Sequence, residues 1–294
     1  MKKIAALFLL LALFVGCCPA PSQKVVVDER QADPAKFWQD GYALQTTAKT
    51  PAAGADSISA LVDGKWQNFE LVEFPQDFID WNKARRIETI EVIKAMMSGG
   101  GMGKGPELAG PHNGIVATEG FRREDASFSL NNAVKGMGFL PREDKIKGII
   151  ELVESTMDAP MPEKLQTLVS FYEGVDTIFA MDRQVSLELY ATPDFMTQSF
   201  MNQMENPIST IVFLDMPSYK LKTIVRLLDP NDPNLTDYEK DAVKYINLIH
   251  SYFHGNFSKD FIAAVYYVNQ VYDNSPMGGN PETGMGRRVV PAFP

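Results

Sequence analysis

Cysteine is nearly absent from this chain, which has two among its 294 residues, the adjacent Cys17 and Cys18. Residues 19–294 therefore cannot form a disulfide bond, and their fold has to rest on an apolar core. The same absence argues against a thiol catalyst in the body of the chain. With 45% hydrophobic residues, the composition is that of an ordinary globular protein that can build such a core.

Signatures of common reactions are missing as well. The chain has no Gly-x-Ser-x-Gly elbow, no Cys-x-x-Cys-His haem attachment and no EF-hand loop. The glycine-rich segment 98–106 resembles a phosphate-binding loop only superficially, because Ser98 and Gly105 stand where a Walker loop needs Gly and Ser or Thr. We therefore predict no nucleotide ligand, and an enzymatic activity is less expected than a binding role.

Basic residues are outnumbered, with 28 Lys and Arg against 37 Asp and Glu, which gives a net charge of −9. An acidic protein is not attracted to nucleic acid or to anionic lipid headgroups. Nucleic acid is therefore excluded as a partner, and any attachment to a membrane has to be covalent.

Long hydrophobic runs are also lacking, apart from one near the start. Ile4–Val15 follows Lys2 and Lys3 and is about twelve residues long, or roughly 18 Å as a helix, which is too short to span a bilayer. Residues 1–16 are therefore expected to be a signal peptide.

The residues that follow, Phe14-Val15-Gly16-Cys17, resemble the lipobox of bacterial lipoproteins. The resemblance implies cleavage before Cys17 and a lipid anchor on that residue. The protein would then lie in the bacterial cell envelope, on the periplasmic face of the outer membrane or on the cell surface. The alternative is an ordinary secretory signal peptide cleaved near Ala20.

Composition and periodicity divide the remainder into segments. We expect a lipidated Cys17 and flexible tether over 17–55, a hairpin-plus-helix subdomain over 56–97, a glycine-rich loop over 98–114, a helical domain over 115–274 and a flexible tail over 275–294. The hairpin rests on Asp63-Gly64, a pair suited to the two positive φ angles of a type I′ turn between alternating strands.

The predicted fold class is mainly α, a multi-helix domain with a small N-terminal β-hairpin. Apolar residues recur at spacings of three and four in segments near 77–97, 141–157, 162–174, 192–204, 218–228, 236–255 and 258–272. The alternative is an α+β, ferredoxin-like unit at 176–273, with strands at 185–191, 208–214, 220–228 and 261–268. Lys222 and Arg226 share a face with Ile224 and Leu228 if 220–228 is a strand, and Ser258 is a helix cap, so we favour helices.

Two groups of residues are candidates for a site. Phe195, Met196, Phe200 and Met204 form a segment able to adapt to an apolar ligand or to another envelope protein, with ordinary core packing as the alternative. His250 and His254 lie one helical turn apart and are candidate metal ligands, with His112 as a third. No catalytic residue and no cofactor other than this metal ion is predicted.

Overall fold

The computed structural model describes residues 34–99, 108–276 and 285–292. The predicted signal peptide, Cys17 and residues 100–107 of the glycine-rich loop lie outside these residues. The helices are η1 (Pro34–Lys36), α1 (Gln76–Met97), α2 (Ile146–Ser155), α3 (Met161–Glu173), α4 (Val175–Ile178), α5 (Gln198–Glu205) and α6 (Asp237–His254). The strands are β1 (Trp38–Gln39), β2 (Tyr42–Ala43), β3 (Ala48–Lys49), β4 (Ser57–Val62), β5 (Lys65–Glu70), β6 (Asn113–Glu119), β7 (Leu130–Gly136), β8 (Arg183–Glu188), β9 (Ile208–Phe213), β10 (Tyr219–Leu228), β11 (Ile262–Asp273) and β12 (Arg287–Val290).

A seven-stranded antiparallel sheet forms the centre of the part that the structure describes. Its strands run in the order β12-β11-β10-β9-β6-β7, and β8 pairs with the first half of β11, on the same edge that β12 uses farther along. The sheet curves until Gly138, just after β7, pairs with Val185 of β8. The strands β6 to β11 thus form a closed ring, which we call the strand ring.

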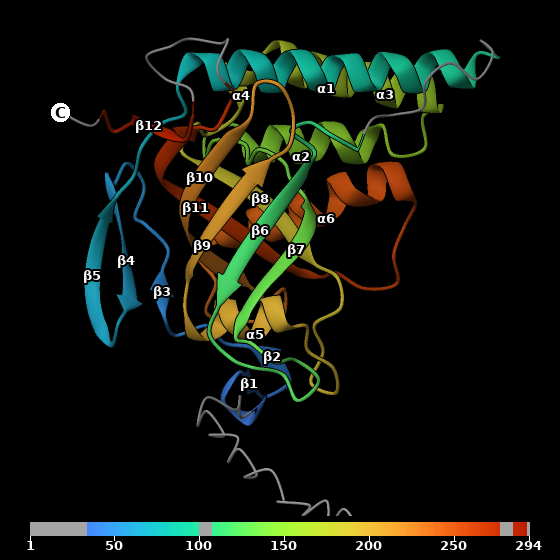
Figure 1. Ribbon diagram of the computed structural model, residues 1–294. Coiled ribbons are helices and arrows are strands. Elements are labelled where there is room, and N and C mark those ends of the chain that lie inside the picture. Colours follow the sequence, from blue (N-terminus) through green and yellow to red (C-terminus); the bar gives the residue numbers. More distant parts are fainter. Residues whose placement is uncertain (1–33, 100–107, 277–284, 293–294) are drawn as a thin grey trace, which may run out of the picture.

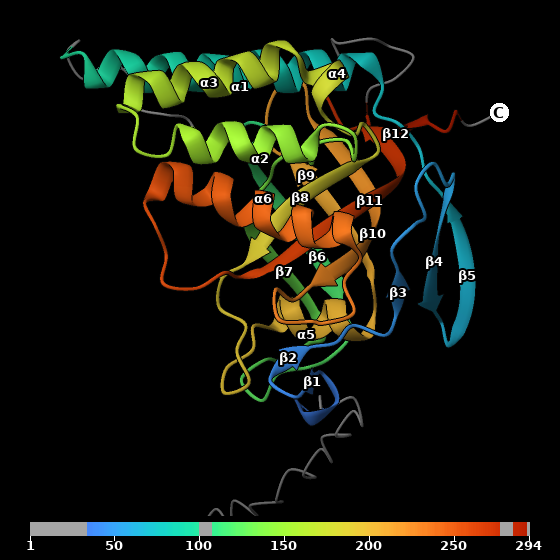
Figure 2. The same cartoon turned by 180° about the vertical axis from the view of Figure 1, so that it is seen from behind.

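Helices and a smaller sheet cover the strand ring on several sides. The helix α1 crosses one end, with α3 beside it, and α5 lies at the opposite end (Figure 1). The helices α2 and α6 pack together over β8 and β11 on one side (Figure 2). The three-stranded sheet β3-β4-β5 lies against β10.

The prediction of a mainly α fold is wrong, and two strands explain why. In β10 Thr223, Ile224 and Val225 are buried in succession, so the second half of the strand lacks the alternation that a strand with one exposed face would show. In β11 nearly every residue is buried, which leaves a continuous apolar run with no period of two. Both segments were therefore open to a helical interpretation.

The rejected alternative placed strands at four segments that are strands in the structure, β8, β9, β10 and β11. It was wrong about their arrangement. A ferredoxin-like unit contains split β-α-β units with parallel strands, whereas here every pairing is antiparallel and the order is β8-β11-β10-β9.

Local signals do account for several elements. Asp63 and Gly64 have φ angles of 52° and 72° in the turn between β4 and β5, as a type I′ turn requires. The helix α6 begins with a complete capping box, in which Thr236 and Glu239 each accept a hydrogen bond from the other residue's backbone N–H.

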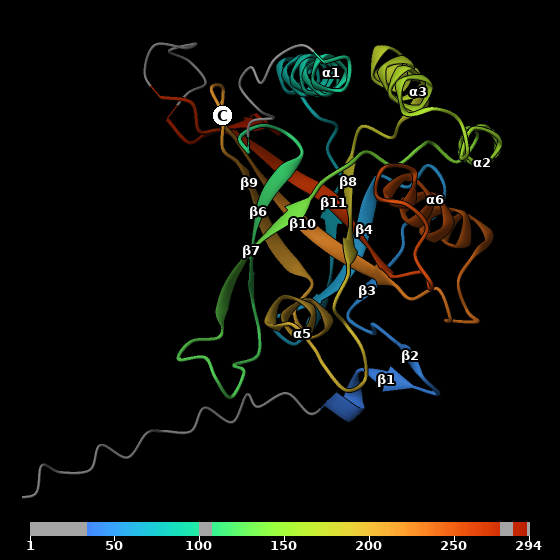
Figure 3. The ribbon, with the colours of Figure 1, turned by 90° about the vertical axis from the view of Figure 1, so that its right-hand side faces the viewer.

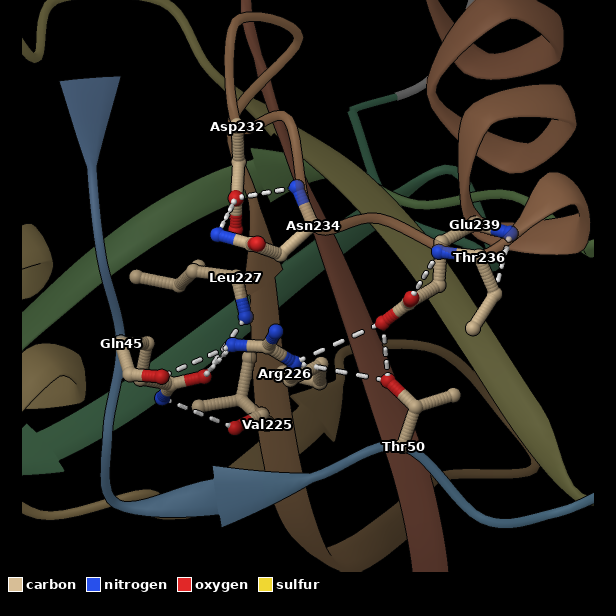
Figure 4. A network of polar contacts seen from close by, with 9 residues as sticks. All are labelled: Gln45, Thr50, Val225, Arg226, Leu227, Asp232, Asn234, Thr236 and Glu239. Carbon is tan, nitrogen blue, oxygen red and sulfur yellow. Dashed lines mark hydrogen bonds and ion pairs between the residues drawn. The ribbon is translucent and has the colours of Figure 1, made fainter.

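Residues 34–55, expected to belong to the tether, pack on the strand ring instead. Gln45 donates from Nε2 to the carbonyl oxygen of Gln203 at 2.9 Å. It also donates to the Val225 carbonyl at 3.1 Å, and its Oε1 accepts from the N–H of Leu227 at 2.9 Å (Figure 4). Arg226 donates to the Gln45 carbonyl at 3.0 Å. This network fixes the N-terminal segment to α5 and β10. At the other end of the chain, part of the expected tail forms β12.

Arg86 of α1 is a buried cation that joins several elements. Its guanidinium donates to the carbonyl oxygens of Pro111 and Met137, at 3.0 and 2.6 Å, to Asn82 Oδ1 at 3.1 Å and to the Tyr172 hydroxyl at 3.1 Å. Arg86 thereby holds α1, α3, the start of β6 and the end of β7 together.

Replacing Arg86 with methionine is expected to lower the free energy of unfolding by about 3 kcal/mol, because two buried carbonyl oxygens would lose their donor. Urea unfolding followed by circular dichroism measures this. Arg142→Met, at a half-exposed side chain, is the matched control and should change stability by less than about 0.5 kcal/mol. Equal effects of the two substitutions would contradict the role given to Arg86.

Candidate functional site

The wall of the strand ring is incomplete between β7 and β8. At one point the two strands meet, where Gly138 and Val185 exchange hydrogen bonds of 2.9 and 2.8 Å. The next antiparallel pairs along this line would be Gly136 with Leu187 and Val134 with Leu189, but the described structure pairs β7 only with β6 and β8 only with β11. We call this open line between β7 and β8 the seam. Figure 3 shows the two strands separating beyond the closed end.

The seam opens into a cleft of about 520 Å³, a size within the range of roughly 300–1,000 Å³ that is common for ligand sites. Its walls are the facing edges of β7 and β8, and its end is the first turn of α5. The lining residues are Arg123, Asp125, Ala126, residues 131–136, residues 187–190 and residues 197–199.

A buried ion pair lies in the cleft. Lys135 of β7 and Glu188 of β8 form a salt bridge, and their side chains are only 8% and 3% exposed. Beside it, Asn131 donates from Nδ2 to the Ser199 hydroxyl at 2.8 Å. The cleft thus offers a cation, an anion, an amide and a hydroxyl group within one small volume.

Polar groups continue from Glu188 into the interior of the ring. Gln184, Ser186 and Glu188 alternate along β8 and therefore share one face, and all three are buried. Tyr266 lies opposite Gln184 in the pairing register, and its hydroxyl accepts a hydrogen bond of 3.0 Å from Gln203 of α5. Burial, and then the negative charge of Glu188, raise the pKa of Tyr266 well above its usual value, which keeps the hydroxyl neutral.

Two of these buried side chains are not satisfied. Neither Nε2 nor Oε1 of Gln184 has a hydrogen-bond partner among the described residues, and the same holds for Oε1 of Gln203. A buried polar atom without a partner costs about 1–3 kcal/mol, so these three atoms have hydrogen-bonding capacity that a water molecule or a ligand group could satisfy.

The helix α5 is positioned by polar contacts with the loop between β6 and β7. Asn202 accepts at Oδ1 from the N–H of Phe121 at 2.8 Å and donates to Thr118, while Gln198 donates to the Phe128 carbonyl at 2.9 Å. Gly120 permits this approach, because a Cβ there would lie 3.0 Å from the Asn202 backbone. Gln198 belongs to the first turn of the helix, which borders the cleft.

The candidate ligand-binding residues predicted from the sequence are not brought onto one open surface. Phe200 and Met204 are buried in the core, where Phe200 packs against Phe37 and Trp38. Met196 accepts a hydrogen bond at its sulfur from Trp38 Nε1 at 3.3 Å, and Phe195 is half exposed. The residues that line the cleft begin at Thr197, one residue after Met196.

The three histidines gather in one region beside the closed end of the seam, where a Cβ on Gly136 would lie 3.5 Å from the ring of His112. The rings of His250 and His254 are 4.7 Å apart, and His250 also stacks on Phe257 at 5.0 Å. His112 is close enough for its charge to interact with both. Within the described ranges, however, no three His, Cys, Asp or Glu side chains are close enough to hold a metal ion together.

Sequence reasoning missed Lys135, Glu188 and Gln184. The alternation of Val185, Leu187 and Leu189 was a signal for a strand at 183–188, but the polar face of such a strand is normally placed toward solvent. Here it lines the interior of the ring.

Lys135→Met is expected to destabilise the protein by about 3–5 kcal/mol, because Glu188 would remain as an unpaired buried charge. The double variant Lys135→Met/Glu188→Leu should recover most of this loss, since an apolar pair needs no neutralisation. Urea unfolding of the wild type, both single variants and the double variant gives the coupling energy. Strictly additive losses would show that the two side chains do not depend on each other.

The stability of the protein should depend on His112 between pH 6.5 and pH 4. Desolvation by the surrounding protein, and then the charge of Arg86, lower the pKa of His112 from 6.5 to about 4. Between these values the unfolded chain binds a proton that the folded protein does not, so this contribution to stability is present above pH 6.5 and is lost as the pH falls toward 4.

The variant His112→Gln should therefore lose less stability than the wild type between these two pH values, as denaturant titrations at several pH values would show. His112 retains contact with solvent, which makes the effect smaller than full burial would give. Identical pH profiles for the two proteins would contradict this assignment.

None of the helices in the described ranges is both long and apolar enough to cross a membrane. Comparison with known proteins places the chain in no family: no family model matches it, and no curated protein sequence matches it significantly. The geometry of the seam is therefore the basis on which a function has to be argued.

Proposed function

We propose that this protein is a lipid-anchored binding module of the bacterial cell envelope, and that its ligand enters the seam cleft between β7 and β8. The observation that carries the proposal is the open seam itself. Strand pairing closes the ring everywhere else, whereas here two strand edges stay apart around a cleft whose floor is the Lys135–Glu188 pair.

The chemistry of the cleft favours recognition of a ligand with both polar and apolar groups. Lys135, Glu188, Asn131 and Ser199 supply donors and acceptors within the cleft. At its outer rim Val134 and Tyr190 are 69% and 68% exposed, which is unusual for large apolar side chains next to a concave surface.

The groups in the cleft also favour binding over catalysis. Lys135 and Glu188 are already engaged with each other, so neither is a free acid or base. Arg123 and Asp125 of the lining are likewise paired with each other, and the remaining polar groups are amides and hydroxyls, which orient a ligand by hydrogen bonds.

The anchor is the lipid expected on Cys17, supported by the short apolar leader and the residues before that cysteine. The described chain enters the fold close to the cleft, because Trp38 contacts Met196, next to Thr197 of the cleft lining. A diacylglyceryl-modified Cys17 at the amino terminus, found by mass spectrometry of the membrane fraction, would support the anchor, and an unmodified terminus beyond residue 17 would contradict it.

The binding site is tested with a set of small amides, amines and carboxylates, each carrying an aromatic or branched alkyl group, screened by NMR against the mature chain. Fragments that bind should shift the resonances of Asn131, Lys135 and Ser199. Ala133→Phe fills the cleft and should weaken binding by at least about ten-fold, or 1.4 kcal/mol.

Ala117→Phe is the matched control, because Ala117 is equally half-buried but lies on the outer face of the neighbouring strand β6. It should change fragment affinity by less than about two-fold. Thermal unfolding of both variants establishes that they are folded. Fragments that bind elsewhere, or equally well to both variants, would overturn the seam as the ligand site.

A further inference from the structure

The pairing registers show which backbone groups face the seam. Met137 donates to the His112 carbonyl at 2.7 Å, so odd-numbered residues of β7 are the ones bonded to β6. Since antiparallel neighbours alternate between bonded and non-bonded pairs, Asn132, Val134 and Gly136 direct their N–H and C=O groups away from β6 and into the seam.

The same argument applies to the opposite wall. Val268 donates to the Asp182 carbonyl at 2.8 Å, so the even-numbered residues of β8 are the ones bonded to β11. Val185 faces the other way and pairs with Gly138. Leu187 therefore also directs its N–H and C=O groups into the seam, and all four residues with such groups line the cleft.

We propose that the ligand of the seam cleft is an extended polypeptide segment, which binds by adding a strand between β7 and β8. This inference rests on the proposed function and names the class of its ligand. Free donors and acceptors at strand spacing are what an added strand uses, and the pairing of a peptide with a sheet edge is a general mode of recognition.

Two common obstacles to such an addition, proline and register shifts, are absent from the two strands. Neither Leu130–Gly136 nor Arg183–Glu188 contains a proline, and neither pairing has a register shift. Exposed edges in proteins are usually blocked by prolines or bulges, so two regular edges facing one cleft are the exception. Residues 132–136 span roughly 17 Å, which is enough for about five residues of an added strand.

The cleft predicts the sequence pattern of the peptide. Alternate side chains of an added strand point to opposite faces of the sheet. Those that point into the ring meet Lys135, Glu188 and Ser199 and should be small and polar. Those that point outward meet Val134 and Tyr190 and should be apolar or aromatic. Because β7 and β8 are antiparallel at Gly138 and Val185, the peptide is antiparallel to one wall and parallel to the other.

The test uses the mature chain and a library of acetylated octapeptides that alternate Ser, Thr or Asn with Val, Leu, Tyr or Phe. Amide hydrogen exchange of the complex, resolved by NMR, should slow at Val134, Gly136 and Leu187. Asn131 and Lys135, whose amides already pair with β6, serve as internal controls and should change little.

Backbone N-methylation of the tightest peptide, one position at a time, then tests strand pairing directly on the wild-type protein. Affinity should fall about ten-fold or more at the alternate positions whose amides face β7 and at the position whose amide faces Leu187 of β8, because a strand between two edges directs successive amides to opposite walls. Losses that follow side-chain identity only, or no loss at these positions, would overturn strand addition.

A substitution in the protein removes one of the seam amides, as N-methylation removes an amide of the peptide. Val134→Pro removes an amide that faces the seam and costs no hydrogen bond to β6, so the fold should be retained while peptide affinity falls about ten-fold. Val134→Thr is the control and should bind normally.

If fragments bind the seam but no peptide slows exchange at these amides, strand addition is wrong and the proposed function stands. If neither fragments nor peptides bind the seam, strand addition and the proposed function are both wrong.

Discussion

The geometry of the seam depends on the hydrogen bonds of Arg86. Its guanidinium holds the Met137 carbonyl, one residue before Gly138, and the Pro111 carbonyl, just before β6. These contacts fix the end of β7 at the point where it meets Val185, and so they set where the seam closes and where it opens. Arg86 has no carboxylate partner among the described residues, and five hydrogen-bonding groups supply what an ion pair would otherwise provide.

The interior of the strand ring has two ends of opposite character. Near α1 it is filled by aromatic rings, with Phe78, Trp81, Phe213 and Tyr219 packed within 6 Å of one another in most pairings. Near α5 it carries Gln203 and other buried polar side chains that apolar residues of similar size would replace at a gain in stability. The apolar end therefore supports the fold, and the polar end is where the protein gives up stability for the cleft.

Local sequence signals were sufficient for elements whose pattern is set by their own residues. The Asp63-Gly64 turn and the capping box at Thr236 are of this kind. The strands β10 and β11 could not be recognised in the same way, because burial of both faces removes the period of two on which such a prediction depends. The candidate site could not be predicted from the sequence for a further reason. Lys135 and Glu188 are 53 positions apart, and they meet only because the sheet closes on itself.

The single bridge between Gly138 and Val185 has a consequence for the empty protein at high concentration. Two regular strand edges at the rim of one molecule are equally suited to the edges of another, and unprotected edges are the usual starting point for aggregation. Copies of the chain thus compete with the ligand for the same hydrogen bonds. An occupied cleft would act as a cap against self-association, and tethering to a surface would keep the copies dilute and similarly oriented.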